Sequence, residues 1–412
     1  MNKKKIFNDP VYGFITIPYD IIFDLIEHPY FQRLRHISQL GLTHLVYPGA
    51  LHTRFSHALG ALHLMNMALD TLKAKGHKIS EVECEAVSAA ILMHDIGHGP
   101  YSHALESSIV KGVAHEDISL MFIDRLNKIY KGDLSLAIDI FKNNYKRPFL
   151  HQLVSSQLDL DRLDYLCRDS FFTGVAEGVV GYQRIISMLD IHKDNLVVEE
   201  KGIYSVEKFL ISRRLMYWQV YYHKTSLSAQ KMIVKILKRA KELANKDIEM
   251  FATPALKYFL YNNVSKGHFE TDTEVLEKFA QLDDFDVFSS IKEWKSHDDI
   301  VLSRLSWNLS NRNLYKIKIQ NEPFDKELVN DLQDKIVKQY NINKKDADYL
   351  VFTDVIKNDA YLSDKQRINI LYKDKTIKDI AEASDNLNIK VLSNPVEKHY
   401  LCFPKEVNFK YL

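Results

Sequence analysis

The stretch of residues 91–103 is the most informative part of the sequence for fold and function, and it reads ILMHDIGHGPYSH. An apolar helical run leads directly into the adjacent pair His94 and Asp95, and His98 follows one helical turn later. The glycines and the proline in this stretch break the helix, so the polar cluster should sit at a helix end that faces a cavity. Polar side chains behind a buried apolar run cost free energy unless they bind something, and histidine is a common metal ligand. The stretch therefore indicates a metal site, with a solvated helix end whose histidines cap carbonyls as the simpler alternative.

The composition favours a helical protein with a large core. The chain has 412 residues, of which 46% are hydrophobic, so it can bury a sizeable core without disulfides. Only 14 glycines and 10 prolines occur, which favours long helices over strands and turns. The three cysteines, Cys84, Cys167 and Cys402, form no CxxC pair, which fits a reduced, cytosolic protein and disfavours a zinc ribbon.

The charge balance argues against two classes of partner. Lys and Arg total 55 against 54 Asp and Glu, so a net charge of +1 creates no global basic field for nucleic acid or an anionic membrane. The basic N-terminal residues lead into no signal peptide, and no apolar run is long enough to span a membrane. We therefore expect a cytoplasmic protein with neither a membrane nor a nucleic acid as its partner.

Hydrophobic spacing predicts a mainly α fold with short β-hairpins. Helices are predicted over residues 20–27, 29–40, 79–93, 101–109, 155–173 and 206–246, with another beginning near residue 54. Hairpins are predicted over residues 9–19 and 195–206, the second turning at Lys201 and Gly202.

The composition shifts after residue 313. Residues 314–320, reading LYKIKIQ, alternate as a strand, and residues 325–340 form an amphipathic helix. Further strands are expected over residues 349–355, 368–372 and 400–403. We therefore expect two domains, a helical catalytic domain over residues 1–312 and a small α+β lobe over residues 313–412.

A second informative stretch covers residues 155–173. Asp161, Tyr165 and Asp169 fall at positions i, i+4 and i+8, so they share one face of a helix whose leucines cover the core. A carboxylate, a phenol and a second carboxylate on one face are uncommon in an otherwise buried helix. The alternative is an amphipathic helix with intrahelical Asp–Arg pairs, each worth a few tenths of a kcal/mol.

Four residues from three segments make a candidate metal-ligand set. His57, His94, Asp95 and Asp161 supply two imidazoles and two carboxylates. Such a mixed set suits Mg, Mn, Fe, Co, Ni or Zn, and carboxylates favour metals that work on phosphate substrates. No thiolate takes part, which disfavours a structural zinc. We therefore expect a divalent metal as cofactor.

The order H…HD…D resembles that of the HD-domain metal phosphohydrolases. Four longer motifs are similar to those of the deoxynucleoside triphosphate (dNTP) triphosphohydrolases, which include bacterial dGTPase-like enzymes and the eukaryotic SAM-and-HD-domain restriction factor. These motifs are FQRLRHISQLG, YPGALHTRFSHALG, HDIGHGPYSHALE and LDLDRLDYLCRDS. The resemblance covers residues 10–240 and does not extend to a SAM domain. It implies an HD-domain helical bundle that holds the metal on His57, His94, Asp95 and Asp161.

The resemblance also implies catalytic and substrate-binding roles. His115, with Glu106 behind it, would be the acid/base pair beside the scissile phosphate, and Glu106 stands where many relatives carry Asp. His98 and His103 would contact phosphate or assist. The residues expected to clamp the triphosphate are Arg54, Arg162 (where some relatives carry Lys) and Arg213. Those expected to read the sugar are Gln39, Tyr165, Asp169, which accepts from the 3′-hydroxyl, and Tyr221, which with Tyr165 excludes a 2′-hydroxyl.

The expected reaction is hydrolysis of a dNTP, with dGTP favoured, to deoxynucleoside and tripolyphosphate. Guanidinium groups bind phosphate oxygens bidentately, which suits a triphosphate of about four negative charges. A divalent metal would polarise the α-phosphate and activate water, and His115 would protonate the leaving 5′-oxygen. No Walker-type glycine loop occurs, which disfavours a P-loop NTPase.

Regulation and assembly follow from the same resemblance. Gln32 and Arg35 match positions where some relatives hold an activating guanine nucleotide, and Glu27 stands near where those relatives carry Asp. We expect an activating nucleotide at a subunit interface, and hence a homo-oligomer, either a dimer or a tetramer.

Two other classes of function stay open. One is an HD phosphodiesterase or nucleotidase that acts on another phosphate ester, such as a cyclic nucleotide or guanosine tetraphosphate. Arg162, Tyr165 and Asp169 favour a deoxynucleotide instead. The other is a non-catalytic nucleotide sensor or single-stranded nucleic-acid binder. The intact metal set and the balanced charge argue against it.

Overall fold

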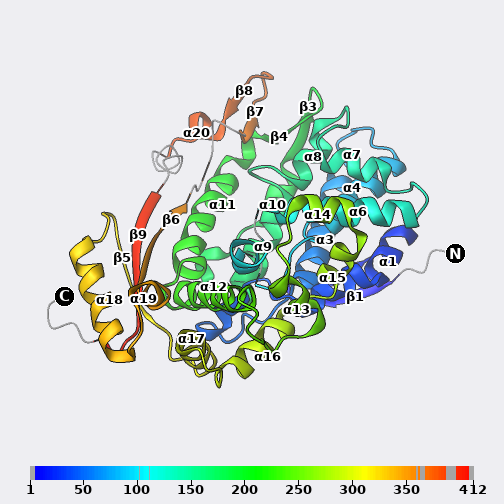
Figure 1. Cartoon of the computed structure of the whole chain (residues 1–412). Helices are drawn as coiled ribbons and strands as arrows, with labels where there is room; N and C mark the ends of the chain where they lie inside the picture. Colours follow the sequence, from blue (N-terminus) through cyan, green and yellow to red (C-terminus); the bar gives the residue numbers. More distant parts are fainter. Residues whose placement is uncertain are drawn as a thin grey trace.

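Among the residues that the structure describes, the fold is mainly α, as predicted, with three small sheets (Figure 1). The computed structural model describes residues 5–101, 103–110, 112–358, 361, 367–386 and 396–407. Within these residues, no helix combines the length and the apolar character that a membrane crossing requires. The helices pack around one continuous hydrophobic core.

The N-terminal hairpin confirms the prediction with a shift of a few residues. Its strands β1 (Ile6–Asp9) and β2 (Gly13–Thr16) pair antiparallel, and the Asp9 carboxylate accepts hydrogen bonds from the turn amides of Val11 and Tyr12. Helix α1 (Asp20–Glu27) follows as expected.

The helix predicted over residues 29–40 is wrong in its length. It stops early, as α2 (Pro29–Gln32) and the 3-10 turn η1 (Arg33–His36). The cause is tertiary: buried Arg33 donates to the carbonyls of Ile96 and His98, both at 2.7 Å. The chain then extends and pairs with the residues before α3, before entering the 3-10 turn η2 (Gly41–Leu45).

Helix α3 (Arg54–Ala74) is the centre of the helical region (Figure 1). It packs against both α4 (Glu81–Met93) and α9 (Leu160–Thr173). The contact with α9 depends on Gly60, since a Cβ there would lie 1.9 Å from Asp164 Oδ1. Around this trio lie α5 (His103–Ser108), α6 (His115–Ile129), α7 (Ser135–Phe141), α8 (Pro148–Val154), η3 (Ala176–Gly178) and α10 (Tyr182–Ser187).

The second predicted hairpin exists, but its position is wrong. The strands are β3 (Leu189–His192) and β4 (Asn195–Glu199), and residues 200–202 form the 3-10 turn η4 (Glu200–Gly202). The tight turn uses Lys193 and Asp194, with φ angles of 50° and 57°. Positive φ at both residues is what a two-residue hairpin turn needs, and here it is met without glycine.

The single helix predicted over residues 206–246 is also wrong. The chain forms α11 (Ile203–Met216), the π-helical turn η5 (Tyr217–Tyr221) and α12 (Lys224–Ala244). The interruption is visible in the backbone, because the amide of Tyr222 bonds to the carbonyl of Tyr217, five residues earlier, at 2.7 Å. Short π segments inside helices are often associated with functional sites.

Five further helices follow α12, of which α13 and α17 pack against it, and the chain then forms the predicted strand-rich region. The helices are α13 (Pro254–Tyr261), α14 (Lys266–Thr271), α15 (Thr273–Ala280), α16 (Asp284–Trp294) and α17 (Ile300–Ser310). The later elements are β5 (Lys316–Gln320), α18 (Lys326–Tyr340), α19 (Lys344–Leu350), β6 (Phe352–Asn358), β7 (Asn369–Leu371), β8 (Ile377–Asp379), α20 (Ile380–Ala383) and β9 (Val396–Phe403).

The C-terminal strands belong to two different sheets. β9 is the central strand of an antiparallel sheet of order β5-β9-β6. β7 instead pairs parallel with β4, so the β3-β4 hairpin extends into a sheet of order β3-β4-β7-β8. The last hundred residues therefore contact the helical region by strand pairing as well as by side chains. The predicted domain boundary at residue 312 stays a prediction.

Candidate active site

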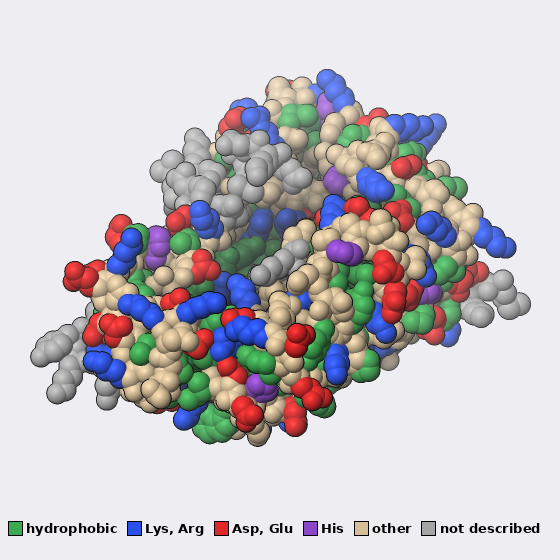
Figure 2. Space-filling model, viewed as in Figure 1, with side chains coloured by type: hydrophobic (Ala, Val, Ile, Leu, Met, Phe, Trp, Pro, Cys, Tyr) green, Lys and Arg blue, Asp and Glu red, His purple; other side chains and the backbone are tan. Residues whose placement is uncertain are grey.

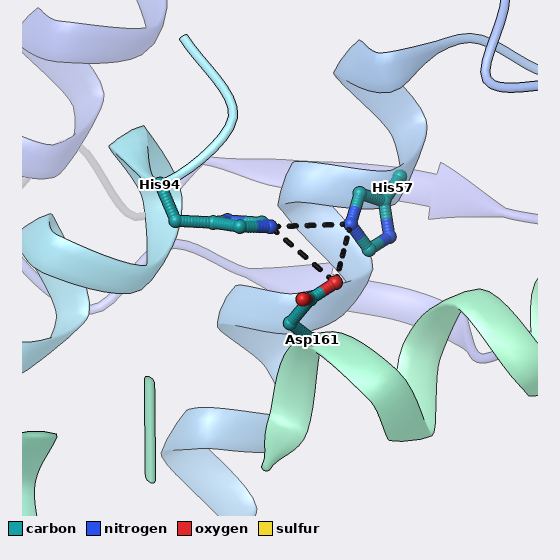
Figure 3. A group of neighbouring side chains, drawn as sticks. All are labelled: His57, His94 and Asp161. Atoms are coloured by element: carbon teal, nitrogen blue, oxygen red, sulfur yellow. Dashed lines mark hydrogen bonds and ion pairs between the residues drawn. The ribbon is translucent and has the colours of Figure 1, made fainter. Parts of the chain in front are cut away.

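Three of the four predicted metal ligands meet where α3, α4 and α9 converge (Figure 3). His57 projects from α3, His94 caps the end of α4, and Asp161 lies in the first turn of α9. Asp161 Oδ1 lies 3.2 Å from His57 Nε2 and 3.4 Å from His94 Nε2. The two ring nitrogens lie 3.3 Å apart. Two imidazole nitrogens and a carboxylate oxygen aimed at one point are a donor set that fits a divalent transition metal or Mg.

Asp95, the fourth predicted ligand, lies beside this cluster. Its Oδ1 is 3.3 Å from His94 Nε2 and 3.2 Å from His98 Nε2. Its Oδ2 is 2.5 Å from a guanidinium nitrogen of Arg54 and 3.8 Å from His57 Nε2. The carboxylate therefore faces the metal cluster while it also pairs with a cation, and its role as a ligand stays a prediction.

The sequence analysis missed the layer that holds His57 in place. His57 Nδ1 lies 2.7 Å from Asp164 Oδ2, and this carboxylate also receives two hydrogen bonds from Arg168, at 2.9 and 3.0 Å. Arg168 in turn donates to Asp9 Oδ2 at 2.7 Å. All four side chains are buried. The signal was the i, i+4 spacing of Asp164 and Arg168, which was not singled out in the sequence.

The electrostatics of the cluster favour positive charge. Burial alone would lower the pKa of His57, but its hydrogen bonds with Asp161 and Asp164 raise that pKa to about 10. Burial would raise the pKa of Asp161, yet His94 and His57 hold it far below its usual range. The site therefore stabilises a cation between the two imidazoles and the carboxylate, as a metal centre requires.

Two predicted catalytic histidines stack beside the metal cluster. The rings of His98 and His115 lie 3.8 Å apart at an interplanar angle of 19°. Burial, with the nearby Arg54 cation, lowers the pKa of His98 to about 3, so this ring is neutral. His115 Nε2 lies 3.3 Å from the exposed carboxylate of Glu116. The side chains of His103 and Glu106 fall outside the part of the structure that is described.

A close backbone contact positions this histidine pair. The hydroxyl of Ser119 on α6 accepts from the Gly97 amide and donates to the His94 carbonyl, both at 2.9 Å. A Cβ on Gly97 would lie 2.2 Å from the His115 carbonyl oxygen, so only glycine allows this approach. The loop after α4 is thereby fixed against the first turn of α6, which carries His115.

Each of the three predicted phosphate-binding arginines has a protein acceptor. Arg54 pairs with Asp95, Arg162 pairs with the buried Asp159, and Arg213 donates to Gln157 at 3.1 Å. Asp159 also caps α9, because its Oδ1 accepts from the Arg162 amide at 2.7 Å. The sequence analysis missed Asp159 and Gln157. The signal was their position, since both lie just before α9, whose first turn carries the predicted ligand Asp161.

The predicted sugar-reading residues form a chain of contacts that includes His52, a residue not predicted from the sequence. Asp169 Oδ2 accepts from the Tyr221 hydroxyl at 2.7 Å, and Asp169 Oδ1 lies 2.8 Å from Nε2 of the buried His52. The backbone amide of Gln39 donates to the backbone carbonyl of His52 at 3.0 Å. Tyr165 lies edge-on to Tyr221, with ring centroids 6.3 Å apart. The structure thus brings Gln39, Tyr165, Asp169 and Tyr221 together.

The segment that carries this cluster matches a known family of proteins. Residues 54–169 match the model of the HD domain, and residues 180–255 match that of the HD associated region. The crystal structure of a phosphohydrolase from Bacteroides thetaiotaomicron is similar over 98% of this chain and 100% of its own, with 54% sequence identity and a TM-score of 0.94. The chain belongs to the HD-domain phosphohydrolase family. The expected relationship to this family is thereby confirmed.

Two further HD-domain relatives are known by sequence. The chain is 34% identical over 323 residues to the uncharacterized protein YwfO of Bacillus subtilis, covering 77% of this chain and 72% of that protein. It is 33% identical over 248 residues to a protein of Dictyostelium discoideum named as a deoxynucleoside triphosphate triphosphohydrolase SAMHD1 homolog. That match covers 56% of this chain and 48% of the relative, so the chain spans about half the length of the SAMHD1 homolog.

Three residues are predicted to bind an activating nucleotide. Glu27 and Arg35 are exposed at the protein surface, and Gln32 is half-buried. Arg35 is exposed, lies 3.6 Å over the Phe55 ring and donates to Gln32 Oε1 at 2.8 Å. Gln32 donates to the Ile26 carbonyl at 2.7 Å, and Glu27 is exposed at the end of α1. Their regulatory role stays a prediction.

The HD-domain fold leaves one face of the molecule hollowed. Figure 2 shows the hollow between the helices around α9 and the C-terminal sheet, in the region of α9 and α11, with Lys and Arg side chains gathered in it. α9 and α11 are the helices that carry Arg162 and Arg213. A cationic hollow over these helices suits an anionic ligand.

Proposed function

We propose that this protein is a metal-dependent dNTP triphosphohydrolase that cleaves its substrate, with dGTP favoured, to deoxynucleoside and tripolyphosphate. One observation carries the proposal. Helix α9 bears Asp161 of the metal cluster in its first turn and Asp169, bonded to Tyr221, eight residues later. Eight helical residues span about 12 Å, a length suited to a nucleotide lying along the helix with its phosphates at one end and its sugar at the other.

The metal would be held by His57, His94 and Asp161, with Asp95 as the fourth ligand. When bound, a divalent ion supplies Lewis-acid polarisation of the α-phosphate and lowers the pKa of water. The mixed imidazole and carboxylate set suits Mn, Mg, Fe, Co, Ni or Zn. His57 is fixed for this role by Asp164, as ligating histidines usually are by an acceptor on their second nitrogen.

The triphosphate would be bound by Arg54, Arg162 and Arg213. Their acceptors Asp95, Asp159 and Gln157 hold the guanidinium groups in place before substrate arrives. Preorganised donors lose less conformational entropy on binding, so more of the interaction energy is available to orient the α-phosphate.

His115 would act as the general acid that protonates the leaving 5′-oxygen. Water attacks the α-phosphorus, the bond from phosphorus to the 5′-oxygen breaks, and His115 gives its proton to that oxygen and recovers the proton that the attacking water releases. The neutral His98 ring stacks on His115 without adding a second positive charge. Glu106 as the partner of His115, and His103 as a phosphate contact, complete the proposed set.

Asp169 and Gln39 would read the sugar. The Asp169 carboxylate has four lone-pair positions, and His52 and Tyr221 use two of them. A 3′-hydroxyl can therefore donate to it. Tyr165 and Tyr221 would pack on the ribose and leave no room for a 2′-hydroxyl. The name of the Dictyostelium relative, a dNTP triphosphohydrolase, supports this substrate class.

The proposal includes regulation by a nucleotide. Glu27, Gln32 and Arg35 would hold an activating nucleotide at the interface of a homo-oligomer. Gel filtration and turnover, each with and without GTP, dGTP or dATP, test this part. Activation together with assembly supports it, whereas unchanged kinetics and a constant monomer would contradict it.

The proposal is tested by identifying which dNTP is hydrolysed and which products form. Purified protein with Mn or Mg is incubated with each of the four dNTPs, and the phosphorus products are separated and identified. We expect tripolyphosphate and deoxynucleoside in equal amounts, and none from the Asp161→Asn variant, which keeps the shape of the ligand but removes its charge. Failure of every dNTP, with every nucleotide mixture, would refute the proposal.

A further inference from the structure

We propose that His52 is a positioning residue that fixes the Asp169 carboxylate for the 3′-hydroxyl, and so determines selection for substrates that carry this group. This inference rests on the proposed function, because it concerns the sugar end of the same site. His52 lies in the loop before α3, outside the metal cluster and outside the arginine set.

The first observation is the contact between the two side chains. His52 Nε2 lies 2.8 Å from Asp169 Oδ1, and the side chains of His52 and Asp169 are 0% and 2% exposed. An ionised carboxylate is only an acceptor, so the histidine must donate its Nε2 proton. The other oxygen accepts from the Tyr221 hydroxyl at 2.7 Å. One donor on each oxygen fixes the rotation of the carboxylate.

The second observation is that the His52 ring is directed at Asp169 and at no other polar group in the described part of the chain. The ring stacks on Phe172, with centroids 4.6 Å apart and planes at 19°. Among the described residues, buried Nδ1 has no hydrogen-bond partner. A buried polar ring costs free energy unless its hydrogen bonds offset that cost. The single hydrogen bond to Asp169 is therefore the interaction for which a histidine, and not a phenylalanine, is needed here.

The third observation concerns the backbone. The His52 carbonyl accepts from the Gln39 amide at 3.0 Å, and the Arg54 amide donates to the Ile37 carbonyl at 3.0 Å. Ser38 and Thr53 form the β-bridge between these bonds. His52 thus ties two predicted sugar-reading residues together, Gln39 through its backbone and Asp169 through its ring.

The consequence of losing the His52 donor is specific. Asp169 would keep the Tyr221 bond but lose the second anchor, so its free lone pairs would no longer be held toward the 3′-hydroxyl. The metal ligands and the arginines contact other groups and would stay in place. A site that hydrogen-bonds a hydroxyl rejects the analogue without it by ~10⁴-fold when the site is well ordered. The loss of His52 should therefore reduce this rejection more than it reduces hydrolysis.

The test compares kcat/KM for a dNTP with kcat/KM for the matching 2′,3′-dideoxynucleoside triphosphate. Two variants are used. His52→Phe keeps a flat ring on Phe172 without the donor, and His52→Gln keeps an N–H donor without the ring. Both substrates are assayed on one preparation, so the ratio does not depend on the folded fraction. His77→Phe is the matched control, because His77 pairs with Asp190 in the same way at 2.5 Å, beyond the far end of α3.

We expect the ratio to fall at least tenfold in His52→Phe, to fall less in His52→Gln, and to stay at the wild-type value in His77→Phe. A wild-type ratio in an active His52→Phe enzyme would overturn this inference and leave the proposed function intact. If His52→Phe does not fold, His52→Leu, which also lacks the donor, replaces it: a ratio clearly nearer to one than the wild-type ratio supports the inference, and an unchanged ratio overturns it. A wild-type enzyme that hydrolyses no dNTP would overturn the proposed function, and this inference with it.

Discussion

His57 and Asp164 are joined by a hydrogen bond of 2.7 Å between Nδ1 and Oδ2, and both side chains are completely buried. His57 turns its other nitrogen, Nε2, toward His94 and Asp161. Asp164 therefore determines the direction of Nε2, the nitrogen proposed to bind the metal, although Asp164 is not itself expected to touch the metal.

Asp164→Asn should weaken metal binding by about 10- to 100-fold, the usual effect of removing a carboxylate behind a ligating histidine. The amide keeps the volume but loses the charge that orients His57. Titration with Mn(II), followed by electron paramagnetic resonance of the free ion, measures the affinity without any substrate.

Asp190→Asn is the control for this change. Asp190 pairs with His77 beyond the end of α3, so the same substitution there removes a His–Asp pair but leaves the cluster intact. Equal Mn(II) affinities for wild type and Asp164→Asn would show that Asp164 does not orient a ligand.

Gly60→Ala should destabilise the protein by ~2 kcal/mol or more, as overpacking of a core does. The new Cβ would lie 1.9 Å from Asp164 Oδ1 and 2.1 Å from a guanidinium nitrogen of Arg168, and both groups are buried. Urea denaturation gives the free energy of unfolding.

Gly267→Ala is the matched helical control. Gly267 lies on the exposed face of α14, where the nearest atom to an added Cβ would be Ser265 Oγ at 3.8 Å. This substitution should stabilise the protein by about 0.5 kcal/mol. A loss of stability at Gly267 equal to that at Gly60 would argue against the steric explanation.

Glu242 should contribute to stability at neutral pH and lose that contribution in acid. Burial would raise its pKa, but hydrogen bonds from Tyr349 and Lys246 and the charge of Arg239 lower it to about 2. A carboxyl whose pKa is lower in the folded state is stabilising above its unfolded value, near 4.5, and loses this effect as the pH falls toward 2. Between pH 4.5 and 2, the stability of Glu242→Gln should therefore fall less steeply than that of wild type in urea denaturation. Parallel stability profiles would contradict the assignment.

Part of the candidate metal cluster could be predicted from local patterns, because its residues lie beside recognisable helix boundaries. His94 ends an apolar helix just before glycines and a proline, and Asp161 lies in the first turn of α9. Their grouping with His57 was predicted from the combination of imidazoles and carboxylates and from the family resemblance, and the structure brings these three residues together.

The residues that hold the site in place were not predictable in the same way. His52 lies 117 residues from its partner Asp169, and nothing in its own neighbourhood marks that contact. Arg33 ends a predicted helix because it reaches the carbonyls of Ile96 and His98, some 60 residues away along the chain. Helical periodicity also continues through residues 217–221, so it did not reveal the π-helical turn that carries Tyr221.

The proposed reaction is tested most directly by hydrolysis of dGTP in water enriched in a heavy oxygen isotope, with metal present. Attack on the α-phosphorus places the heavy oxygen in tripolyphosphate and leaves the deoxyguanosine unlabelled. Removal of the metal with a chelator should stop the reaction, and the return of Mn should restore it. Label in the nucleoside, or release of orthophosphate or pyrophosphate in place of tripolyphosphate, would contradict the proposed function.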